Sequence, residues 1–308
     1  MRILVVGAGA TGGYFGALPA RAGQDVTFLV RPHRATVLRS RGLRVVDRDE
    51  EWSVEPRLVT ADALTGRYDL VLLSVKSTAL RQAIEDVAPA VGPGTAVVPM
   101  LNGLAHIDAL NARFGAGQVL GGVAKVVTTL NDEGDIVRLA PLAQLTIGEQ
   151  GGGLSPRVEK IRSVLAESGV DVLVSEDVTA AMWHKWVFIT TFGAVTSLMR
   201  GTVGEVNAEP GGTELGPAVL AEAAAVAAAA GYPVPERETA ATLGIVTATG
   251  SPMVPSLYRD LVAGRPTEVE HLFGDLVARA RALSVATPLL DLATLHLRVH
   301  QRRALAGS

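Results

Sequence analysis

Hydrophobic positions follow different patterns in the two halves of the chain. In the first half, short apolar runs alternate with segments of helical periodicity, the runs being residues 3–6, 26–30, 70–75 and 96–98. Runs of this length are typical of strands that are buried on both faces of a parallel sheet. Their alternation with helices predicts βαβ units, and therefore an α/β fold built on a doubly wound sheet.

Helical periodicity dominates the rest of the chain. Beyond about residue 175, apolar positions recur at helical spacing in five segments, which are residues 178–198, 217–230, 236–249, 268–283 and 288–302. Before them, the turn-forming stretch at 131–134 predicts a hairpin, and residues 144–147 predict one more strand. We therefore place a boundary near residue 170, with an α/β domain at 1–170 and an all-α domain at 171–308.

The composition excludes several classes of function. Of the 308 residues, 48% are hydrophobic and 19% are charged, which is typical of a soluble globular protein, and the net charge of −3 argues against a nucleic-acid partner. The absence of cysteine excludes disulfides, thiol catalysis and cysteine-ligated metals, and the histidines lack the spacing of a metal site. No signal peptide or membrane-spanning stretch stands out, so we expect a cytoplasmic protein with no membrane partner.

A glycine-rich turn directly follows the first predicted strand and opens a predicted helix. Its glycines have the G-x-G-x-x-G spacing of dinucleotide-binding Rossmann sites. In such sites the first glycine permits a tight turn, the second lets the backbone approach a pyrophosphate, and the third lets helix and strand pack closely. The helix N-terminus adds positive potential for the phosphates. The predicted cofactor-binding residues of this turn are Gly7, Ala8, Gly9, Ala10, Thr11 and Gly12.

Arg31 follows the second predicted strand. An NAD site usually has an acidic residue about 20 positions after the glycines, where its carboxylate binds the ribose 2′-hydroxyl. Here that place is taken by Arg31, and Arg34 follows shortly after. A guanidinium suits a 2′-phosphate, so the sequence predicts NADPH as the cofactor and residues 1–170 as an NADPH-binding domain. The alternative is a solvated loop arginine, which is common on protein surfaces.

Two polar residues follow later strands of the predicted sheet. Lys76 ends the third predicted strand, and Asn102 comes shortly after the fourth. Ligands of doubly wound sheets bind at these carboxyl ends, so both side chains are expected to face the cofactor or the substrate. Each residue taken alone is equally compatible with a solvated side chain or a turn.

Lys185 stands in a very apolar segment. Trp183 and Trp186 flank it, and Val-Phe-Ile follows. Desolvation lowers the pKa of a lysine and makes it a better proton donor near neutral pH. A lysine whose aliphatic stem covers apolar surface while its ammonium group reaches water explains the same pattern equally well.

Together these segments resemble the ketopantoate reductase (2-dehydropantoate 2-reductase) family over essentially the whole chain. The resemblance rests on the order and spacing of several short motifs, which are Gly7–Gly12, Arg31, Val75-Lys76, Asn102-Gly103, Trp183-His-Lys185, Gly204-Glu205, Ser256-Leu-Tyr-Arg-Asp260 and Thr267-Glu268. It implies a Rossmann domain followed by an all-α domain, with the active site in the cleft between them.

The resemblance also implies a role for each matched side chain. Lys185 would protonate the keto oxygen as hydride arrives from NADPH, and Glu268 would support that lysine. Ser256 would hold the substrate carboxylate, while Lys76 and Asn102 would contact the cofactor or the substrate. Physical chemistry agrees with this assignment, because a ketone that becomes an alkoxide needs a proton at its oxygen and a nearby carboxylate keeps a desolvated lysine charged.

Three positions depart from the family pattern. Members of the family carry asparagines where this chain has Ile189, Gly193 and Val203. A site built on hydrogen bonds to its substrate rejects analogues that lack the bonding group, so the loss of three amides predicts a more apolar pocket. Thr190 and Thr191 would compensate only if the helix were shifted.

Three functions follow, in this order. The first is NADPH-dependent reduction of ketopantoate to pantoate, a step of pantothenate biosynthesis. The second is reduction of a more apolar 2-oxo acid or ketone on the same scaffold, and the third is an NADPH-binding sensor without turnover. Retention of Lys185 and Glu268 argues against the sensor. For an enzyme of this type the partner is a small-molecule 2-oxo acid, and the apolar helices are compatible with a homodimer face as well as with internal packing.

Overall fold

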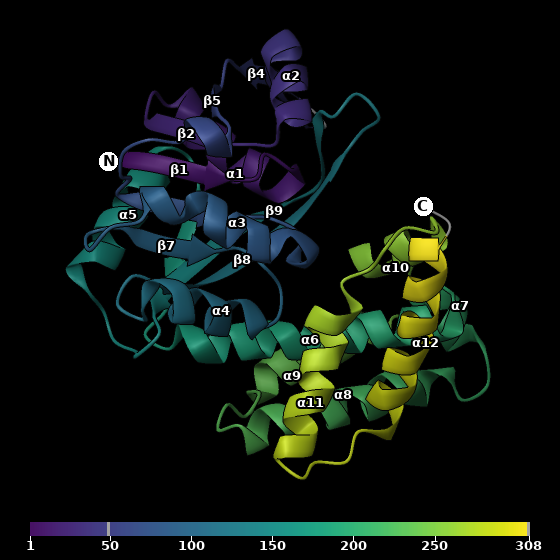
Figure 1. Cartoon of the computed structure of the whole chain (residues 1–308). Helices are drawn as coiled ribbons and strands as arrows, with labels where there is room; N and C mark the ends of the chain where they lie inside the picture. The colour runs from purple at the N-terminus through teal and green to yellow at the C-terminus, as the bar shows by residue number, and fades with distance from the viewer. Residues whose placement is uncertain (48–49, 307–308) are drawn as a thin grey trace. The chain divides into compact units, whose positions relative to one another are not determined.

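The computed structural model describes residues 1–47 and 50–306, and Figure 1 shows its helices and strands. A five-stranded parallel sheet comes first, in the order β5-β2-β1-β6-β7. Its strands are β1 (Arg2–Val6), β2 (Asp25–Leu29), β5 (Arg57–Val59), β6 (Leu70–Leu73) and β7 (Ala96–Pro99). The order in which strands are added to the sheet reverses at β1, which pairs with β2 on one side and with β6 on the other. The predicted doubly wound sheet is therefore confirmed.

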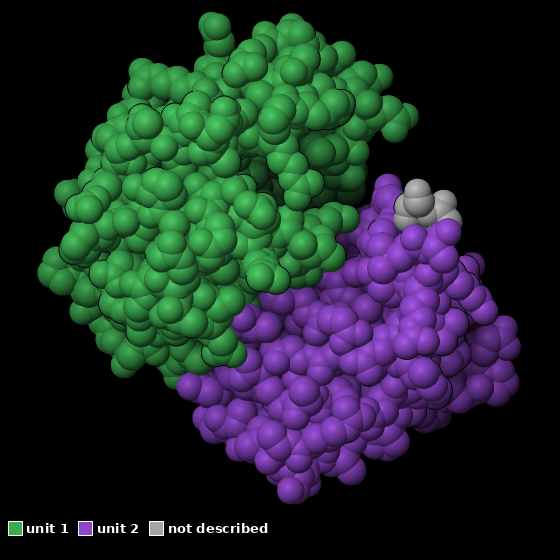
Figure 2. All heavy atoms as spheres, viewed as in Figure 1, with its two compact units in different colours: residues 1–101, 106–179 green, residues 102–105, 180–308 purple. Residues whose placement is uncertain are grey.

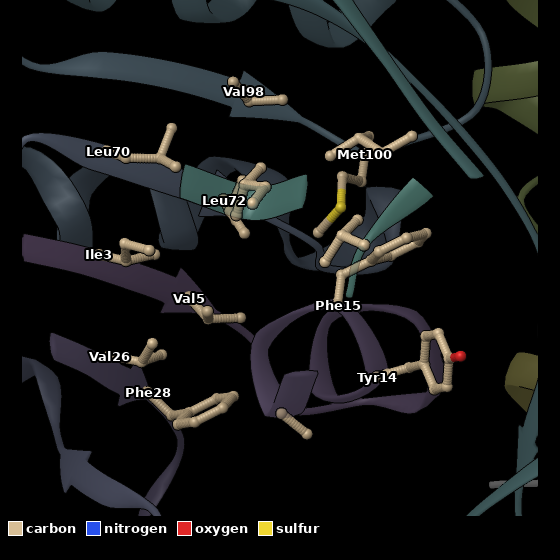
Figure 3. Packing of buried hydrophobic residues seen from close by; sticks show 14 of the residues in the cluster. Ile3, Val5, Tyr14, Phe15, Val26, Phe28, Leu70, Leu72, Val98 and Met100 are labelled. Atoms are coloured by element: carbon tan, nitrogen blue, oxygen red, sulfur yellow. The ribbon is translucent and has the colours of Figure 1, made fainter. Parts of the chain in front are cut away.

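Both faces of this sheet are buried, as its apolar runs predict. Ile3 packs in a cluster with α1 (Ala10–Arg21), whereas its neighbour Leu4 packs in a cluster with α3 (Leu80–Val87). Figure 3 shows the first of these clusters, in which Phe15 of α1 meets side chains from the strands of the sheet. Helices on both faces explain why the strands carry no polar side.

A second sheet is predicted only in part. Its order is β10-β9-β3-β4, and β8 pairs with β9. The strands are β3 (Leu43–Val46), β4 (Glu51–Val54), β8 (Leu120–Leu130), β9 (Ile136–Glu149) and β10 (Asp171–Val174). The predicted hairpin is confirmed as β8 and β9, and residues 144–147 continue β9 instead of forming a separate strand. The pattern misses β3, β4 and β10, and also β5 of the first sheet, because each is a run of three or four residues that is only partly buried.

Helix α1 packs in one core with both sheets because two of its faces carry glycines, which have no side chain. A methyl group added to Gly16 would lie 2.7 Å from Val5 Cγ2 in β1, and one added to Gly13 would lie 2.6 Å from Ile136 Cδ1 in β9. These glycines let the helix approach both sheets closely. The other helices and 3₁₀ turns before residue 171 are α2 (Pro32–Arg41), η1 (Ala61–Ala63), η2 (Ser77–Ala79), η3 (Ala88–Ala90), α4 (Ala105–Phe114) and α5 (Pro156–Glu167).

Helices make up the remainder of the described chain. They are α6 (Val178–Met199), α7 (Val203–Ala208), α8 (Gly212–Ala229), α9 (Glu236–Val246), α10 (Ser256–Val262), α11 (Asp275–Ala282) and α12 (Pro288–Ala306). The single helix predicted at 268–283 is wrong in one respect, because a π-helical turn, η4 (Glu270–Gly274), precedes α11. None of the helices in the described ranges is long and apolar enough to cross a membrane.

The chain divides into two compact units, which Figure 2 shows in green and purple. Unit 1 comprises Met1–Leu101 and His106–Thr179, and unit 2 comprises Asn102–Ala105 and Ala180–Ser308. The division falls after residue 179 and not near residue 170, because β10 pairs in parallel with β9 and so belongs to unit 1. The short segment Asn102–Ala105 is the second departure from the predicted domains.

Candidate functional site

The glycine-rich turn between β1 and α1 lies against the end of β6. Gly7 has a φ of +94°, which favours glycine, and a methyl group on it would lie 2.5 Å from the Ser74 carbonyl oxygen. A methyl group on Gly12 would lie 2.3 Å from the Gly7 carbonyl oxygen. The backbone itself therefore requires glycine at these two positions.

Gly9 differs from the other two glycines because open space surrounds it. No described atom lies within 4 Å of the point that a methyl group on Gly9 would occupy. Gly9 is the N-cap of α1, it provides no side-chain cap, and the first turn of the helix contains no acidic residue. A diphosphate placed there would meet the first N–H groups of the helix and the positive end of its dipole. The residues present thus fit the pyrophosphate of a dinucleotide.

Arg31 and Arg34 have different surroundings although they are neighbours in sequence. Arg31 is exposed at the N-cap of α2. Arg34 is half-buried, and its guanidinium donates to the Ala8 carbonyl at 3.1 Å and to the Gly134 carbonyl at 2.9 Å. Burial lowers the pKa of Arg34, while the Asp135 carboxylate acts in the opposite direction. Arg34 therefore ties the glycine-rich turn to the β8–β9 hairpin, and Arg31 is the guanidinium that is exposed to a ligand.

Lys76 lies just beyond the carboxyl end of β6, as the sequence predicts. Its side chain is exposed, and its carbonyl accepts a hydrogen bond from the Ala79 N–H at 2.8 Å to start turn η2. Ser74, two residues before Lys76, contacts the glycine-rich turn. The nucleotide-side residues Gly7–Gly12, Arg31 and Lys76 therefore all follow adjacent strands of one parallel sheet within unit 1.

Lys185, the predicted proton donor, lies in α6 and is half-buried. Trp183 and Trp186 are buried, and their ring centroids lie 5.1 Å apart. The Trp183 ring also stacks on the Tyr232 ring at 6.0 Å. The two tryptophans that flank Lys185 in sequence thus belong to a buried aromatic cluster, and the desolvation of the lysine itself stays a prediction.

Segments that are far apart in the sequence meet at the π-helical turn η4. The Trp186 indole Nε1 donates to the Leu272 carbonyl at 2.8 Å, which joins the helix of Lys185 to this turn. A methyl group on Gly103 would lie 3.0 Å from the His271 carbonyl oxygen, so the Asn-Gly segment after β7 lies against the same turn. This contact accounts for the assignment of residues 102–105 to unit 2.

The C-terminal half of α6 contacts the turn a second time. A methyl group on Gly193 would lie 3.0 Å from Leu257 Cδ2 and 3.3 Å from Phe273 Cζ. Leu257 follows Ser256, the first residue of α10, and Phe273 belongs to η4. The structure therefore gathers within unit 2 the segments of four predicted catalytic and substrate-binding residues, which are Asn102, Lys185, Ser256 and Glu268, whereas Lys76, also predicted to contact the substrate, lies in unit 1.

The surroundings of these four side chains are compatible with the predicted roles, which stay predictions. Ser256 is exposed at the start of its helix, and Glu268 is half-buried just before η4. Asn102 and Lys185 are half-buried as well. The convergence could not be read from the sequence, because the four residues are separated by loops and helices of unrelated length.

The threonines of α6 do not compensate for the missing asparagines. Thr190 Oγ1 donates to the Trp186 carbonyl at 2.7 Å, and Thr191 Oγ1 donates to the Val187 carbonyl at 2.8 Å. Both threonines are fully buried. Because their hydroxyl groups donate to backbone carbonyls of α6, they are not available to a substrate. The residues after Lys185 therefore offer an apolar surface.

One motif of the family resemblance has a structural role. A methyl group on Gly204 would lie 2.5 Å from the Ser251 nitrogen, so α7 approaches that loop closely. Glu205 completes a capping box with Thr202, and each side chain accepts a backbone N–H of the other residue. The Thr-x-x-Glu spacing signals this cap in the sequence. By contrast, neither η4 nor the Trp186 hydrogen bond has a local sequence signal.

Comparison with known proteins decides the family. A family model described as "Ketopantoate reductase PanE/ApbA" matches residues 3–152, and the corresponding C-terminal model matches residues 177–301. The chain belongs to the ketopantoate reductase family. An uncharacterized oxidoreductase of Bacillus subtilis (strain 168), YkpB, is 31% identical over 301 residues, which are 98% of this chain and 99% of that protein.

Solved structures of this fold include a PanE/ApbA family ketopantoate reductase from Ralstonia eutropha JMP134. It has a TM-score of 0.89 and 26% identity, and the match covers 99% of this chain and 100% of that chain. A D-mandelate dehydrogenase, in a ternary structure with NADH and anilino(oxo)acetate, also has a TM-score of 0.89, with the same coverage. At 21% identity it shows the fold alone.

Family membership confirms the predicted resemblance and makes the chain an oxidoreductase of the 2-dehydropantoate 2-reductase type. Its cofactor is a nicotinamide dinucleotide. The open space at Gly9 and the start of α1 fit such a group. Within residues 1–47 and 50–306, no three histidine, aspartate or glutamate side chains gather as metal ligands.

Proposed function

We propose that this ketopantoate reductase homologue uses NADPH to reduce a 2-oxo acid to the 2-hydroxy acid, with Lys185 as the proton donor. The observation that carries the proposal is the convergence of the segments of Lys185, Ser256 and Glu268 on one turn of unit 2. A cation, a hydroxyl group and a carboxylate carried by these packed segments would suit an anionic substrate with a carbonyl group.

Each side chain has one task in the proposed reaction. When bound, the cofactor supplies a hydride, which the C2 carbon of the oxo acid accepts. Lys185 Nζ gives a proton to the keto oxygen, so the C=O bond becomes a C–O–H group and no alkoxide is left. Ser256 Oγ donates to the substrate carboxylate. Glu268 favours the protonated form of Lys185, which offsets the desolvation of that lysine.

The choice of NADPH over NADH is supported by Arg31. Its guanidinium is exposed two residues after β2, where a ribose 2′-phosphate would be held. Arg34 is engaged with backbone carbonyls, so a single arginine carries the discrimination. Because the D-mandelate dehydrogenase of the same fold holds NADH, the test must compare both cofactors.

Two substrates are candidates, and the geometry of α6 favours the second. Ketopantoate is supported by the family and by the presence of the lysine, the serine and the glutamate. A 2-oxo acid with a more apolar side chain is supported by Gly193, where Leu257 and Phe273 occupy the space next to the helix. A side chain at Gly193 would require Leu257 and Phe273 to move by a few tenths of an ångström, which disfavours an asparagine there.

The test uses two acids that differ in one hydroxyl group. Ketopantoate carries a hydroxymethyl group where 3,3-dimethyl-2-oxobutanoate carries a methyl group. We expect the enzyme to oxidise NADPH with the second acid at a kcat/KM equal to or above that with ketopantoate, and faster with NADPH than with NADH. A preference of about a hundredfold for ketopantoate would contradict the apolar pocket and would assign the chain to pantothenate biosynthesis. Tight NADPH binding with no turnover of either acid, or of bulkier apolar 2-oxo acids, would contradict the proposed enzymatic function. It would leave an NADPH-binding sensor as the function.

A further inference from the structure

The Trp186 side chain connects the helix of the predicted proton donor to the segment of the predicted carboxylate. Trp186 follows Lys185 in α6, and its indole Nε1 donates to the Leu272 carbonyl at 2.8 Å. The N–H of Leu272 in turn donates to the Glu268 carbonyl at 3.0 Å. Leu272 thus connects two predicted catalytic segments. Its N–H binds the Glu268 carbonyl, and its carbonyl binds the side chain of Trp186, the residue next to Lys185.

The indole ring is fixed in its orientation. Trp186 is fully buried, with 0% of its surface exposed. The Trp183 ring lies 5.1 Å from it, and the guanidinium of Arg279 lies 5.8 Å from its ring centroid. A ring that is packed in this way cannot turn to another acceptor without opening the core, so the hydrogen bond to Leu272 determines where α6 lies relative to η4.

The acceptor of this hydrogen bond, the Leu272 carbonyl, lies in the π-helical turn η4. Turns of this kind are rare and occur mostly as single insertions in α-helices, frequently at functional sites. Here the turn begins at Glu270, two residues after Glu268, and contains both Leu272 and Phe273. The Phe273 ring lies against Gly193 of α6, so helix and turn are held together at two points.

We propose that Trp186 is a positioning residue, whose N–H bond to the Leu272 carbonyl sets the register between Lys185 and Glu268. The proposal rests on the function proposed above and adds to it a residue that touches neither substrate nor cofactor. Loss of this bond would remove a buried hydrogen bond between α6 and η4 and let the turn shift against the helix. A shift of about 1 Å in a reacting geometry is enough to slow an enzyme by about a hundredfold.

The test replaces the N–H donor and keeps the ring. One variant carries benzothienylalanine at position 186, which has a sulfur atom in place of the indole N–H, and the second variant is Trp186→Phe. The matched control is Trp183→Phe, which keeps an aromatic ring beside Trp186, because Trp183 is also buried and its described contacts are ring contacts. We expect kcat to fall about tenfold or more in both variants at position 186, with KM and NADPH affinity changed less than threefold and with Trp183→Phe near wild type.

A second readout does not depend on turnover. The chain has four lysines, so trace acetylation at different pH values followed by peptide mass spectrometry reports on Lys185, with Lys76, Lys125 and Lys160 as internal references. If Glu268 moves away, the charged form of Lys185 loses support, and the pH of half-maximal labelling falls by about half a unit or more. The reference lysines should keep their labelling curves in every variant.

The outcomes separate this proposal from the proposed function. A selective shift of Lys185 labelling in the variants at position 186 supports the positioning role even if wild type turns over no 2-oxo acid, which would overturn the proposed function alone. Unchanged kcat and unchanged Lys185 labelling in the benzothienylalanine protein would overturn the positioning role. Equal losses in the variants at 183 and 186, with unchanged labelling of Lys185, would do the same and leave only core packing.

Discussion

The cofactor turn of unit 1 and the predicted substrate-side residues of unit 2 are positioned in different ways. In unit 1 the cofactor turn is backbone: Gly7 and Gly12 allow the chain to fold tightly, and Gly9 leaves open space at the start of α1. In unit 2 the proposed chemistry depends on side chains such as Lys185 and Ser256, whose segments are far apart in the sequence and meet through tertiary packing. The first arrangement is local in sequence, and the second depends on the tertiary fold.

This difference explains why the cofactor class is easier to predict than the substrate. A backbone turn constrains its few residues to glycine, and the ligand of such a turn is similar in all proteins that have it. A side-chain pocket tolerates substitutions as long as volume is conserved, so we expect Ile189 and Gly193 to change what the pocket accepts while the fold stays intact. The cofactor turn of unit 1 and the side-chain site of unit 2 can each be tested alone.

The largest effect is expected from the proton donor in unit 2. Lys185→Met keeps the length of the side chain and removes its proton, so kcat with the better 2-oxo acid should fall by about a hundredfold to ten-thousandfold. NADPH affinity, measured by fluorescence titration, should stay within threefold of wild type because the nucleotide turn lies in unit 1. Lys160→Met, at an exposed position of α5, is the control and should behave as wild type. Retention of kcat in Lys185→Met would remove the lysine from the mechanism.

The next effect concerns the exposed arginine of unit 1. Arg31→Glu should weaken NADPH binding by about tenfold to a hundredfold and leave NADH binding nearly unchanged, because only NADPH brings a 2′-phosphate to the new carboxylate. Titration of both cofactors measures this ratio. Arg39→Glu, exposed on the same helix, controls for net charge. Arg34→Gln should weaken both cofactors alike because Arg34 supports the Ala8 carbonyl, and equal losses for both cofactors in Arg31→Glu would exclude a role in 2′-phosphate binding.

A smaller effect is expected where the pocket of unit 2 departs from the family. Ile189→Asn returns one amide to a half-buried position of α6. The ratio of kcat/KM for ketopantoate to that for 3,3-dimethyl-2-oxobutanoate should rise about tenfold, since the amide can pair with the extra hydroxyl group. Ile245→Asn, at a half-buried position of α9, is the matched control. An unchanged ratio would show that residue 189 does not face the substrate.

The smallest effect compares one ion pair from each unit. Hydrogen bonding to Arg157 lowers the pKa of Glu149 in unit 1, and hydrogen bonding to Arg298 lowers the pKa of Glu270 in unit 2. A carboxylate with a depressed pKa in the folded state adds stability above its unfolded-state pKa, and this stability is lost as the pH falls through the folded-state pKa. Arg157→Gln should cost about 1 kcal/mol or less at neutral pH, and Arg298→Gln less still, because the second pair is more exposed.

Thermal unfolding of the two variants beside wild type measures this comparison. The differences in Tm should be present at neutral pH and should shrink in acid, once both carboxylates are protonated also in the folded state. A difference that persists unchanged in acid would show that the arginines act by packing and not by charge.

The sequence predicts the parts of this molecule that are determined locally. The apolar runs of β1, β2, β6 and β7 and the glycine spacing at the start of α1 are enough to predict four of the five strands of the first sheet and a dinucleotide ligand. The strands β3, β4 and β10 are missed because their pairing partners, and not their own residues, make them strands. A four-residue strand with exposed positions has too few alternations to be distinguished from a loop.

The candidate site of unit 2 is predictable in its residues and not in its geometry. Lys185 stands out because two tryptophans flank it, yet the sequence treats Trp186 only as an apolar neighbour. Its hydrogen bond to Leu272 crosses 86 positions. The π-helical turn arises where α6, residues 102–105 and α10 pack around one segment, and no spacing of residues within 268–283 encodes it. Such features follow from tertiary packing, which a single sequence does not display.

The most direct measurement follows the hydride itself. The protein is incubated with NADPH that carries deuterium at both C4 positions of the nicotinamide, together with 3,3-dimethyl-2-oxobutanoate or ketopantoate, and the product is examined by mass spectrometry. The account predicts a 2-hydroxy acid with one deuterium on C2 and a hydroxyl proton that comes from solvent through Lys185. A product without deuterium on C2, or oxidation of NADPH with no hydroxy acid formed, would contradict it.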